Sequence, residues 1–392
     1  MSAYPKNLQY ITKRISNYSR ATKRLSTLNS TSATNNGVIT VDMPSNTLID
    51  TDSLIMSFKA ITDTGGMPRN IESIIQRCDL EVNGQVIGGF SNYNQLFNII
   101  ADTSFGADCH NRRKIVQSGG DGSAIPIGIP KDYCICNWLT LNSFQPSILD
   151  TKLLGQVRLR IQLDGSNCLI GGGQFILSDI SFSVDTISID DGLFDAAHNA
   201  FLQNGGVYEI MFKNYFSFSS AASSYSQSTK FSVSSQSVNR AWGMFVDQSP
   251  TGALDAVTKN CNTFVRKATG MESAQFTING TYYPDFRANV GQCFSLTQSS
   301  YNQLQDTLGG SSPLCDSFAS WRDKFFVLSC KFCHNDDEFM SGIDTRGNSS
   351  IGAFESQAVS GAAGSANLTA MVFIECSSMI RVGAGRMLEL VL

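Results

Sequence analysis

The sequence predicts an all-β protein built from two tandem jelly-roll β-sandwiches, with a short N-terminal helix and a few connecting helices. Three observations lead to this fold class: a strand–turn–helix unit that occurs twice, a series of segments with alternating apolar residues, and the length of the chain. At 392 residues the chain exceeds the roughly 250–300 residues at which a single core stops growing, so two domains are expected. Charged residues make up only 16% of the chain, below the usual figure of about 25%, so its surface depends on neutral polar side chains.

The repeated unit is a strand that runs into an Asn-Gly turn and is followed by a helical pattern. Asn83-Gly84 and Asn279-Gly280 are 196 residues apart, half of the 392 residues of the chain. An Asn-Gly pair suits the positive-φ positions of a tight hairpin turn. Apolar residues at helical spacing follow each turn: Tyr93, Leu96, Phe97 and Ile100 in the first half, and Phe294, Tyr301, Leu304 and Leu308 in the second. The same order at a half-length offset indicates a duplicated fold.

Most of the remaining chain has the pattern of short strands. Between Val157 and Leu163, apolar residues alternate with Arg158, Arg160 and Gln162, as in a half-buried antiparallel strand. Strand signals also cover residues 38–41, 54–61, 71–82, 138–141, 175–189, 207–218, 231–233, 238–246, 274–278, 325–332, 368–376 and 379–392. Short strands, few helices and long loops favour a pair of β-sandwiches, with the jelly roll as the leading candidate.

The expected domain organisation follows from the segments between these strands. Residues 190–203 have a helical pattern that stops at Asn204-Gly205-Gly206, which is a plausible junction. We therefore expect an N-terminal arm and linker over residues 1–45, a first jelly roll with its connecting helix over residues 46–203, and a second jelly roll over residues 204–392. Two long Gly/Ser-rich stretches, residues 102–130 and 335–366, are predicted to be loops.

The N-terminal arm stands apart by its charge. Residues 1–41 carry six basic and no acidic residues, against a net charge of −4 for the whole chain, so the remainder carries −10. The basic residues are Lys6, Lys13, Arg14, Arg20, Lys23 and Arg24, and the apolar residues Leu8, Ile11, Ile15, Tyr18 and Leu25 give the segment a helical stripe. A basic amphipathic arm fits a surface of lipid head groups or nucleic acid. The alternative is an arm that packs on its own domain or on a neighbour, with its charges in solvent.

The sequence predicts no catalytic, metal or cofactor site. Three histidines are few for acid–base or metal chemistry, and no phosphate loop, dinucleotide fingerprint or Gly-x-Ser-x-Gly motif occurs. Residues 330–334 have the haem-attachment spacing Cys-x-x-Cys-His, but they lie within or just after a strand-like run, which favours cysteines of a core. A zinc site would need Cys109 and His110 to come together with Cys330, Cys333 and His334. Eleven cysteines without an apolar leader segment at the start predict free thiols and assembly in a reducing compartment.

Taken together, these features resemble one family. The repeated units lie in residues 71–100 and 271–308, and the second contains the block Phe-Thr-Ile-Asn-Gly-Thr-Tyr-Tyr-Pro at residues 276–284. This block is similar to the strand and turn that precede a helix in virophage-type capsid proteins, and residues 237–246 are similar to a second-domain strand of the same group. The chain therefore resembles the double jelly-roll major capsid proteins of the tectivirus and adenovirus lineage, which includes virophages and Polinton-like viruses.

The resemblance implies a structural protein of the virion and not an enzyme. It implies homotrimers of pseudo-hexagonal outline that build an icosahedral shell inside the host cell, with long loops outside and the basic residues of the arm facing inward. The expected partners are further copies of the chain, minor capsid or penton proteins, and an internal membrane or the genome through the arm. No cofactor, metal or small-molecule substrate is expected.

Two other functions remain open at this point. A tandem β-sandwich could be a carbohydrate-binding or glycan-acting protein, which would need exposed aromatic residues or a carboxylate pair. The three tryptophans, Trp138, Trp242 and Trp321, are few and lie in strand-like segments, which disfavours that function. A minor capsid or spike protein of jelly-roll type is harder to separate by sequence.

Overall fold

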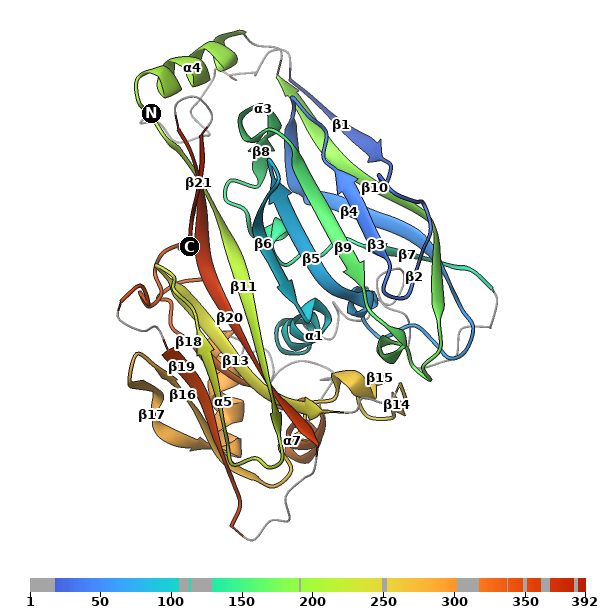
Figure 1. Ribbon diagram of the computed structural model, residues 1–392, viewed down its shortest axis with the longest axis vertical. Helices are drawn as coiled ribbons and strands as arrows, with labels where there is room; N and C mark the ends of the chain where they lie inside the picture. The colour runs from blue at the N-terminus through green and yellow to red at the C-terminus, as the bar shows by residue number, and fades with distance from the viewer. Residues whose placement is uncertain are drawn as a thin grey trace, which may run out of the picture.

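The computed structural model describes residues 18–105, 113, 129–189, 192–248, 252–301, 317–336, 338–347, 351–360, 367–383 and 387–392. These residues form two β-sandwiches that lie side by side (Figure 1). Each sandwich has two antiparallel sheets, and the same order of strands recurs in both. We call them the first and the second sandwich.

The first sandwich is built from residues 18–189. One sheet has the order β1-β10-β4-β7, with β2 paired to β10 and β8 paired to β4, and the facing sheet has the order β3-β9-β5-β6. The strands are β1 (Tyr18–Leu25), β2 (Ala33–Thr34), β3 (Val38–Asp42), β4 (Leu48–Thr62), β5 (Ile75–Val82), β6 (Gln85–Ser91), β7 (Lys131–Ile135), β8 (Ile148–Asp150), β9 (Val157–Leu163) and β10 (Phe175–Ile189). The helices are η2 (Ile71–Ile74), α1 (Tyr93–Ser104), η3 (Leu141–Ser143), α3 (Thr151–Leu154) and η4 (Ser166–Cys168).

Helix α4 (Gly192–Gln203) leads from the first sandwich to the second. The sheets of the second sandwich have the orders β11-β20-β13-β18, with β21 paired to β20, and β12-β19-β16-β17. The strands are β11 (Tyr208–Ala222), β12 (Gln227–Ser232), β13 (Val238–Asp247), β14 (Leu254–Asp255), β15 (Asn260–Cys261), β16 (Met271–Ile278), β17 (Thr281–Asn289), β18 (Leu328–Lys331), β19 (Ile351–Ala358), β20 (Leu368–Val382) and β21 (Leu388–Val391). The helices are η5 (Asn262–Phe264), α5 (Val290–Ser300) and α7 (Phe318–Lys324).

The two sandwiches match strand by strand. Reading each sheet in order, β1, β10, β4 and β7 correspond to β11, β20, β13 and β18, while β3, β9, β5 and β6 correspond to β12, β19, β16 and β17. The two Asn-Gly turns join equivalent strands, since Asn83 links β5 to β6 and Asn279 links β16 to β17, with φ values of 50° and 51°. A helix follows each hairpin, α1 in one case and α5 in the other. The predicted duplication and the two jelly rolls are confirmed.

Two apolar cores hold the molecule together. The second core lies inside the second sandwich, where Phe276, Phe354 and Phe245 pack on one another. The first core fills the first sandwich and continues onto the second, because it includes Trp242 and Phe373 of β13 and β20. Strand β20 therefore buries side chains on both faces, with alternate residues in alternate cores. The junction of the two sandwiches is thus part of the folded core.

The structure corrects the prediction for the N-terminal segment. Tyr18 and Leu25, which were assigned to a helical stripe, are the two ends of strand β1, whose eight residues all pair with β10. Residues 19–24 of this strand are exposed, so its sequence does not alternate between buried and exposed positions. The strand is held in place by its backbone pairing with β10. The segment expected to be a separate arm and linker therefore supplies strands β1, β2 and β3 of the first sandwich, and residues 1–17 lie outside the described part of the chain.

Other predictions are met in part. Residues 157–163 and 175–189 form β9 and β10 with the predicted bounds, and the four inward residues of β9 are buried. Residues 138–141 are not a strand but a turn that enters η3, and residues 71–74 form η2 ahead of β5. The predicted loop over residues 335–366 contains β19, and the last predicted strands are one long strand, β20, followed by β21. Within the described residues, no helix is long and apolar enough to cross a membrane.

Candidate functional site: the junction of the two sandwiches

The junction is centred on a contact between β6 of the first sandwich and β11 of the second. The rings of Phe90 and Tyr215 are 5.4 Å apart, and those of Phe144 and Phe212 stack at 5.1 Å. Gly88 on β6 lets the two strands approach, because a Cβ atom there would lie 3.0 Å from Thr140 and 3.5 Å from the ring of Phe212. Buried aromatic pairs of this kind add about 0.5–1.5 kcal/mol each beyond their buried area.

Backbone hydrogen bonds extend this contact along β11. The amide of Gln145 donates to the carbonyl of Met211 at 2.8 Å, and the amide of Met211 donates back at 3.1 Å. The amide of Lys213 donates to Oγ of Ser143 at 2.8 Å. The segment around η3 therefore continues the sheet of the second sandwich for a short distance, which fixes the two halves in register.

A buried ionic cluster joins helix α1 to the second sandwich. Asp102, on α1, accepts hydrogen bonds from Arg69 and, at 2.7 Å, from Nη2 of Arg266. Arg266 has 0% of its side chain exposed, and the side chains of Arg69 and Asp102 are 5% and 6% exposed. Arg69 also donates to the carbonyl of Thr258 at 2.9 Å. Because an unpaired charge is costly in such surroundings, this cluster ties the first half of the chain to residues 258–266.

Amide side chains of α1 add to the same contact. Gln95 donates to the carbonyl of Thr263 at 2.8 Å, and Asn98 accepts from Asn260 at 3.1 Å. Asn98 in turn donates to Oγ of Ser73 at 2.7 Å. Helix α1 is therefore buried between its own sandwich and the loop that follows β15, although the sequence shows only an amphipathic pattern for it.

A second buried charge lies beside the junction in the second sandwich. Nη2 of Arg240 donates to the carbonyl of Ser300 at 2.7 Å and to Asp336 at 2.9 Å, and its guanidinium stacks 4.5 Å from the ring centre of Tyr301. Burial opposes ionisation of Asp336, but the charge of Arg240 and the hydrogen bond from Lys331 outweigh it, so the pKa of Asp336 lies below its ordinary value. This ion pair anchors the loop that follows β18.

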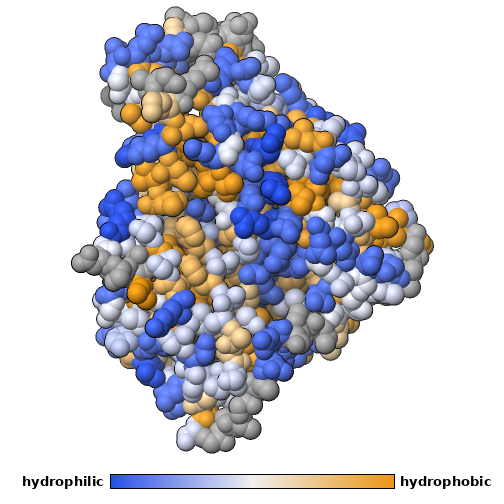
Figure 2. Space-filling view, in the orientation of Figure 1, coloured by the Kyte–Doolittle hydropathy of each residue, from blue (hydrophilic) through white to orange (hydrophobic). Residues whose placement is uncertain are grey.

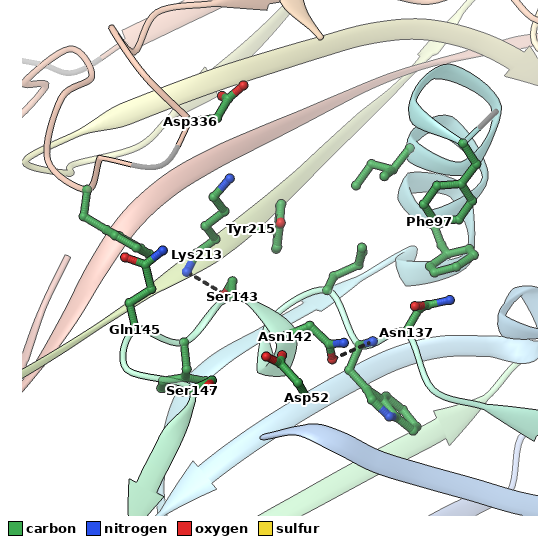
Figure 3. Close-up of a pocket in the computed structure, with 16 residues that line it drawn as sticks. Asp52, Phe97, Asn137, Asn142, Ser143, Gln145, Ser147, Lys213, Tyr215 and Asp336 are labelled. Atoms are coloured by element: carbon green, nitrogen blue, oxygen red, sulfur yellow. Dashed lines mark hydrogen bonds between the residues drawn. The ribbon is translucent and has the colours of Figure 1, made fainter. Parts of the chain in front are cut away.

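A cleft of about 560 Å³ opens at the junction (Figure 3). Its walls come from α1, from residues 137–147, from β11 and from the loop near Asp336. Asp52 and Lys213 contribute charges of opposite sign from opposite sides, and Asn137, Asn142 and neighbouring residues supply neutral polar groups. The lining therefore mixes charged side chains with amides and aromatic rings, and Lys213 is itself paired with Glu375 at 3.4 Å. The residues that line the cleft assemble no nucleophile–base pair.

The structure separates the six basic residues predicted to face an anionic surface. Lys6, Lys13 and Arg14 lie outside the described residues. Arg20 binds two aspartates of its own sheet, Asp185 at 2.8 Å and Asp50 at 2.6 Å, so its charge is satisfied within the chain. Hydrogen bonds from Thr22 and Arg20 hold the pKa of Asp185 below its ordinary value.

The remaining two basic residues, Lys23 and Arg24, are exposed on the edge strand β1. Within the described residues, these two side chains are the part of the predicted basic set that faces solvent outside the ion pairs of the first sandwich. Sequence reasoning could not find the partners of Arg20, because Asp50 and Asp185 are 30 and 165 residues away.

Of the cysteines that were weighed as ligands, Cys330 lies in the core of the second sandwich and Cys333 is buried just after strand β18. Cys330 is on β18 and its thiol pKa is raised to about 12 by burial, while Sγ of Cys333 is 3.5 Å from Asp336. Cys109 and His110 lie outside the described residues. Over the described ranges, no three His, Cys, Asp or Glu side chains are grouped as a metal site would require, and no disulfide links the nine described cysteines to one another.

Comparisons with known proteins bear on the fold. The sequence matches no protein-family model and no curated protein. Among solved structures, the chain is similar to VP54 of PBCV-1, fitted into a reconstruction of the virophage Sputnik, with a TM-score of 0.67 and 15% identity over 98% of this chain and 99% of that one. The Faustovirus major capsid protein matches with a TM-score of 0.58 and 9% identity over 96% and 92% of the two chains. The mavirus major capsid protein matches with a TM-score of 0.53 and 11% identity over 99% and 93%.

The chain has the double jelly-roll fold of these major capsid proteins. The matches span the whole chain, so both jelly rolls and the junction between them belong to the shared architecture. The expectation of a double jelly roll is confirmed, and at these identities the likeness concerns the fold. The signal that could be read in the sequence was the pair of Asn-Gly hairpins at equivalent places.

Proposed function

We propose that the chain is the major capsid protein of a virus and that three copies form a capsomer of pseudo-hexagonal outline in an icosahedral shell. The observation that carries the proposal is the double jelly-roll fold over the whole chain, shared with proteins that are themselves major capsid proteins. Two fused jelly rolls per chain give six in a trimer, which suits a lattice in which each capsomer has six neighbours. The protein would then reside in the virion.

The proposed domain division follows the sheets. We place the second jelly roll at residues 204–392 and begin the first at β1, because Tyr18–Leu25 pairs with β10. The arm proper is then residues 1–17, which carry Lys6, Lys13 and Arg14.

For the basic residues, we propose an inward role that Arg20 does not share. Lys6, Lys13 and Arg14 of the arm, with Lys23 and Arg24 on β1, would face an internal membrane or the genome. Each contact with a phosphate is weak and salt-dependent, but every subunit repeats it. Minor capsid or penton proteins would be further partners of the assembled shell.

The proposed role is structural, without catalysis, cofactor or small-molecule substrate. The alternative of a carbohydrate-binding tandem sandwich needs exposed aromatic platforms. Trp138, Trp242 and Trp321 are all buried, and the indole of Trp138 donates to the carbonyl of Leu54 at 3.0 Å. The tryptophans therefore serve the core and cannot stack on a sugar ring.

Sedimentation of the purified chain tests the proposal. We expect a stable trimer, and electron microscopy of concentrated material should show plates or particles with six-fold outlines. A monomer at all concentrations would refute the capsid role and return the glycan-binding alternative. A trimer that appears in virions at low copy number would instead support a minor capsid or spike protein.

A further inference from the structure

The chain contains four Asn-Gly pairs, and all four lie within the described residues. They are Asn36-Gly37, Asn83-Gly84, Asn204-Gly205 and Asn279-Gly280. An Asn-Gly pair can deamidate without an enzyme, because the main-chain nitrogen of the glycine attacks the side-chain amide carbon of the asparagine and glycine has no Cβ atom to hinder the approach. The surroundings of each pair decide whether this attack occurs in the folded protein.

In two of the pairs, the attacking nitrogen is already held by a hydrogen bond. The amide of Gly37 donates to the carbonyl of Thr34 at 2.9 Å, and the amide of Gly205 donates to the carbonyl of Leu202 at 3.1 Å. In each pair this bond must break before the nitrogen can lose its proton and attack, and breaking it has a free-energy cost. We therefore expect both pairs to react slowly while the protein is folded.

The pair at Asn83 is protected through the asparagine side chain. Oδ1 of Asn83 accepts a hydrogen bond from the amide of Gln156 at 3.1 Å. The same oxygen packs on Gly155, where a Cβ atom would collide with it. The segment that leads from α3 into β9 therefore fixes the side-chain amide of Asn83, which cannot turn toward the nitrogen of Gly84 without losing these contacts.

The equivalent pair at Asn279 is held at neither group. Both of its residues are exposed, and within the described part of the chain no hydrogen bond involves the side chain of Asn279 or the amide of Gly280. A Cβ atom placed on Gly280 would meet nothing within 4 Å. The β16–β17 hairpin lies in the lower part of the molecule (Figure 1), where the face shown in Figure 2 is mainly polar or neutral. Water and hydroxide therefore have access to this turn.

We infer that Asn279 is a site of spontaneous deamidation in the folded protein and that the other three Asn-Gly pairs are protected. The main-chain nitrogen of Gly280 loses its proton to hydroxide and attacks Cγ of Asn279. A new C–N bond closes a succinimide ring, and the side-chain nitrogen leaves as ammonia. Water then opens the ring at either of its two carbonyl groups, which gives aspartate or isoaspartate. The net reaction consumes water and releases ammonia, and it requires no enzyme, cofactor or oxidant.

Either product changes the β16–β17 hairpin. Each adds a negative charge to a turn that carries none, and isoaspartate also lengthens the main chain by one carbon atom. The turn pairs Ile278 with Thr281, and the register of a hairpin depends on the length of its turn. Strand β17 is the edge of its sheet, so the altered hairpin can loosen without disturbing the strands behind it. This chemistry involves only the folded chain and does not depend on the proposed function.

Peptide mapping of aged protein tests the inference. The purified chain is kept in a mildly alkaline buffer, samples are digested at intervals, and mass spectrometry follows each Asn-Gly peptide, with isoaspartate identified by its enzymatic methylation. We expect Asn279 to react at least about tenfold faster than Asn83, a ratio that corresponds to about 1.4 kcal/mol and to the net value of a hydrogen bond such as the one from Gln156. Asn36 and Asn204, followed in the same digests, should react as slowly as Asn83.

Two controls separate the effect of the fold from that of the local sequence. In the urea-denatured chain the turns are lost, so all four pairs should react at similar rates. Asn279→Gln cannot close the same ring and should remove the product at this position, while circular dichroism checks that the variant folds. Equal rates at Asn83 and Asn279 in the native protein would overturn the inference. It would also be overturned if Asn279 stayed unmodified in the native protein under conditions in which the denatured chain reacts.

Discussion

Replacing Asp102 with asparagine should destabilise the junction of the two jelly rolls strongly. Asp102 is the shared carboxylate between Arg69 and Arg266, and Arg266 has 0% of its side chain exposed. The amide keeps the shape of the side chain but removes its charge, so two buried guanidinium groups lose their counter-ion. Breaking a buried pair in this way costs about 3–5 kcal/mol, a large share of the roughly 5–15 kcal/mol by which most proteins are stable.

Urea denaturation followed by tryptophan fluorescence measures this effect, since Trp138 and Trp242 lie in the core that crosses the junction. With a slope of about 3 kcal/mol per molar urea, the midpoint of Asp102→Asn should fall by more than about 1 M. Asp42→Asn is the matched control, because Asp42 binds Arg158 at 2.7 Å in a pair whose side chains are 27% and 34% exposed. The control should shift the midpoint far less. Equal shifts of the urea midpoint in the two variants would refute the conclusion that this ionic cluster stabilises the junction of the two jelly rolls.

Three further predictions follow from the described residues. Deleting residues 2–25 removes β1 and leaves β10 without its eight-residue partner, so soluble trimers should be lost; intact trimers after the deletion would show that β1 is dispensable. Burial tends to raise the pKa of Asp336, but the charge of Arg240 and other contacts outweigh it, so this pKa is lowered in the folded protein. The ionised Asp336 therefore stabilises the fold above its unfolded pKa of about 4, and this contribution is lost as the pH falls through the lower folded pKa. Asp336→Asn should therefore reduce the loss of thermal stability as the pH falls below about 4, and an unchanged profile would contradict the assignment. Burial raises the thiol pKa of Cys293 and Cys330 to about 12. Neither thiol should therefore react with iodoacetamide in the native protein, and both should react after denaturation under non-reducing conditions. A stoichiometric disulfide found by mass spectrometry would contradict this prediction.

The position of the N-terminal arm gives a last test. If Lys6, Lys13 and Arg14 face the particle interior, trypsin should cut after them in free trimers and spare them in intact particles. Equal rates of cleavage in the two samples would place the arm outside the shell.

Local chemistry allowed the sequence to predict some features closely. The Asn-Gly turns at Asn83 and Asn279 adopt φ values near 50° because that pair tolerates the left-handed region whatever surrounds it. Strands β9 and β10 have the predicted bounds, since each buries one face and therefore alternates in sequence.

Other elements had no local signature. Strand β1 is exposed at residues 19–24 and is ordered by its backbone ladder with β10, whose residues are more than 150 positions away. Strand β19 lies in a stretch whose Gly and Ser content favours a loop, and its pairing with β16 and β12 supplies the missing order. Propensity is a weak guide where tertiary pairing decides.

The sequence by itself therefore determined the fold class, the duplication and the strands that alternate, because those depend on short-range patterns of apolar residues and turns. Only the tertiary structure decided which charges are paired and which surfaces are covered. Asp102 meets Arg266 from 164 positions away, and Arg20 meets Asp185 from 165, so no local pattern could show that one arginine is buried and the other neutralised. The same holds for β4 and β13, whose different burial follows from what packs on them after the chain has folded.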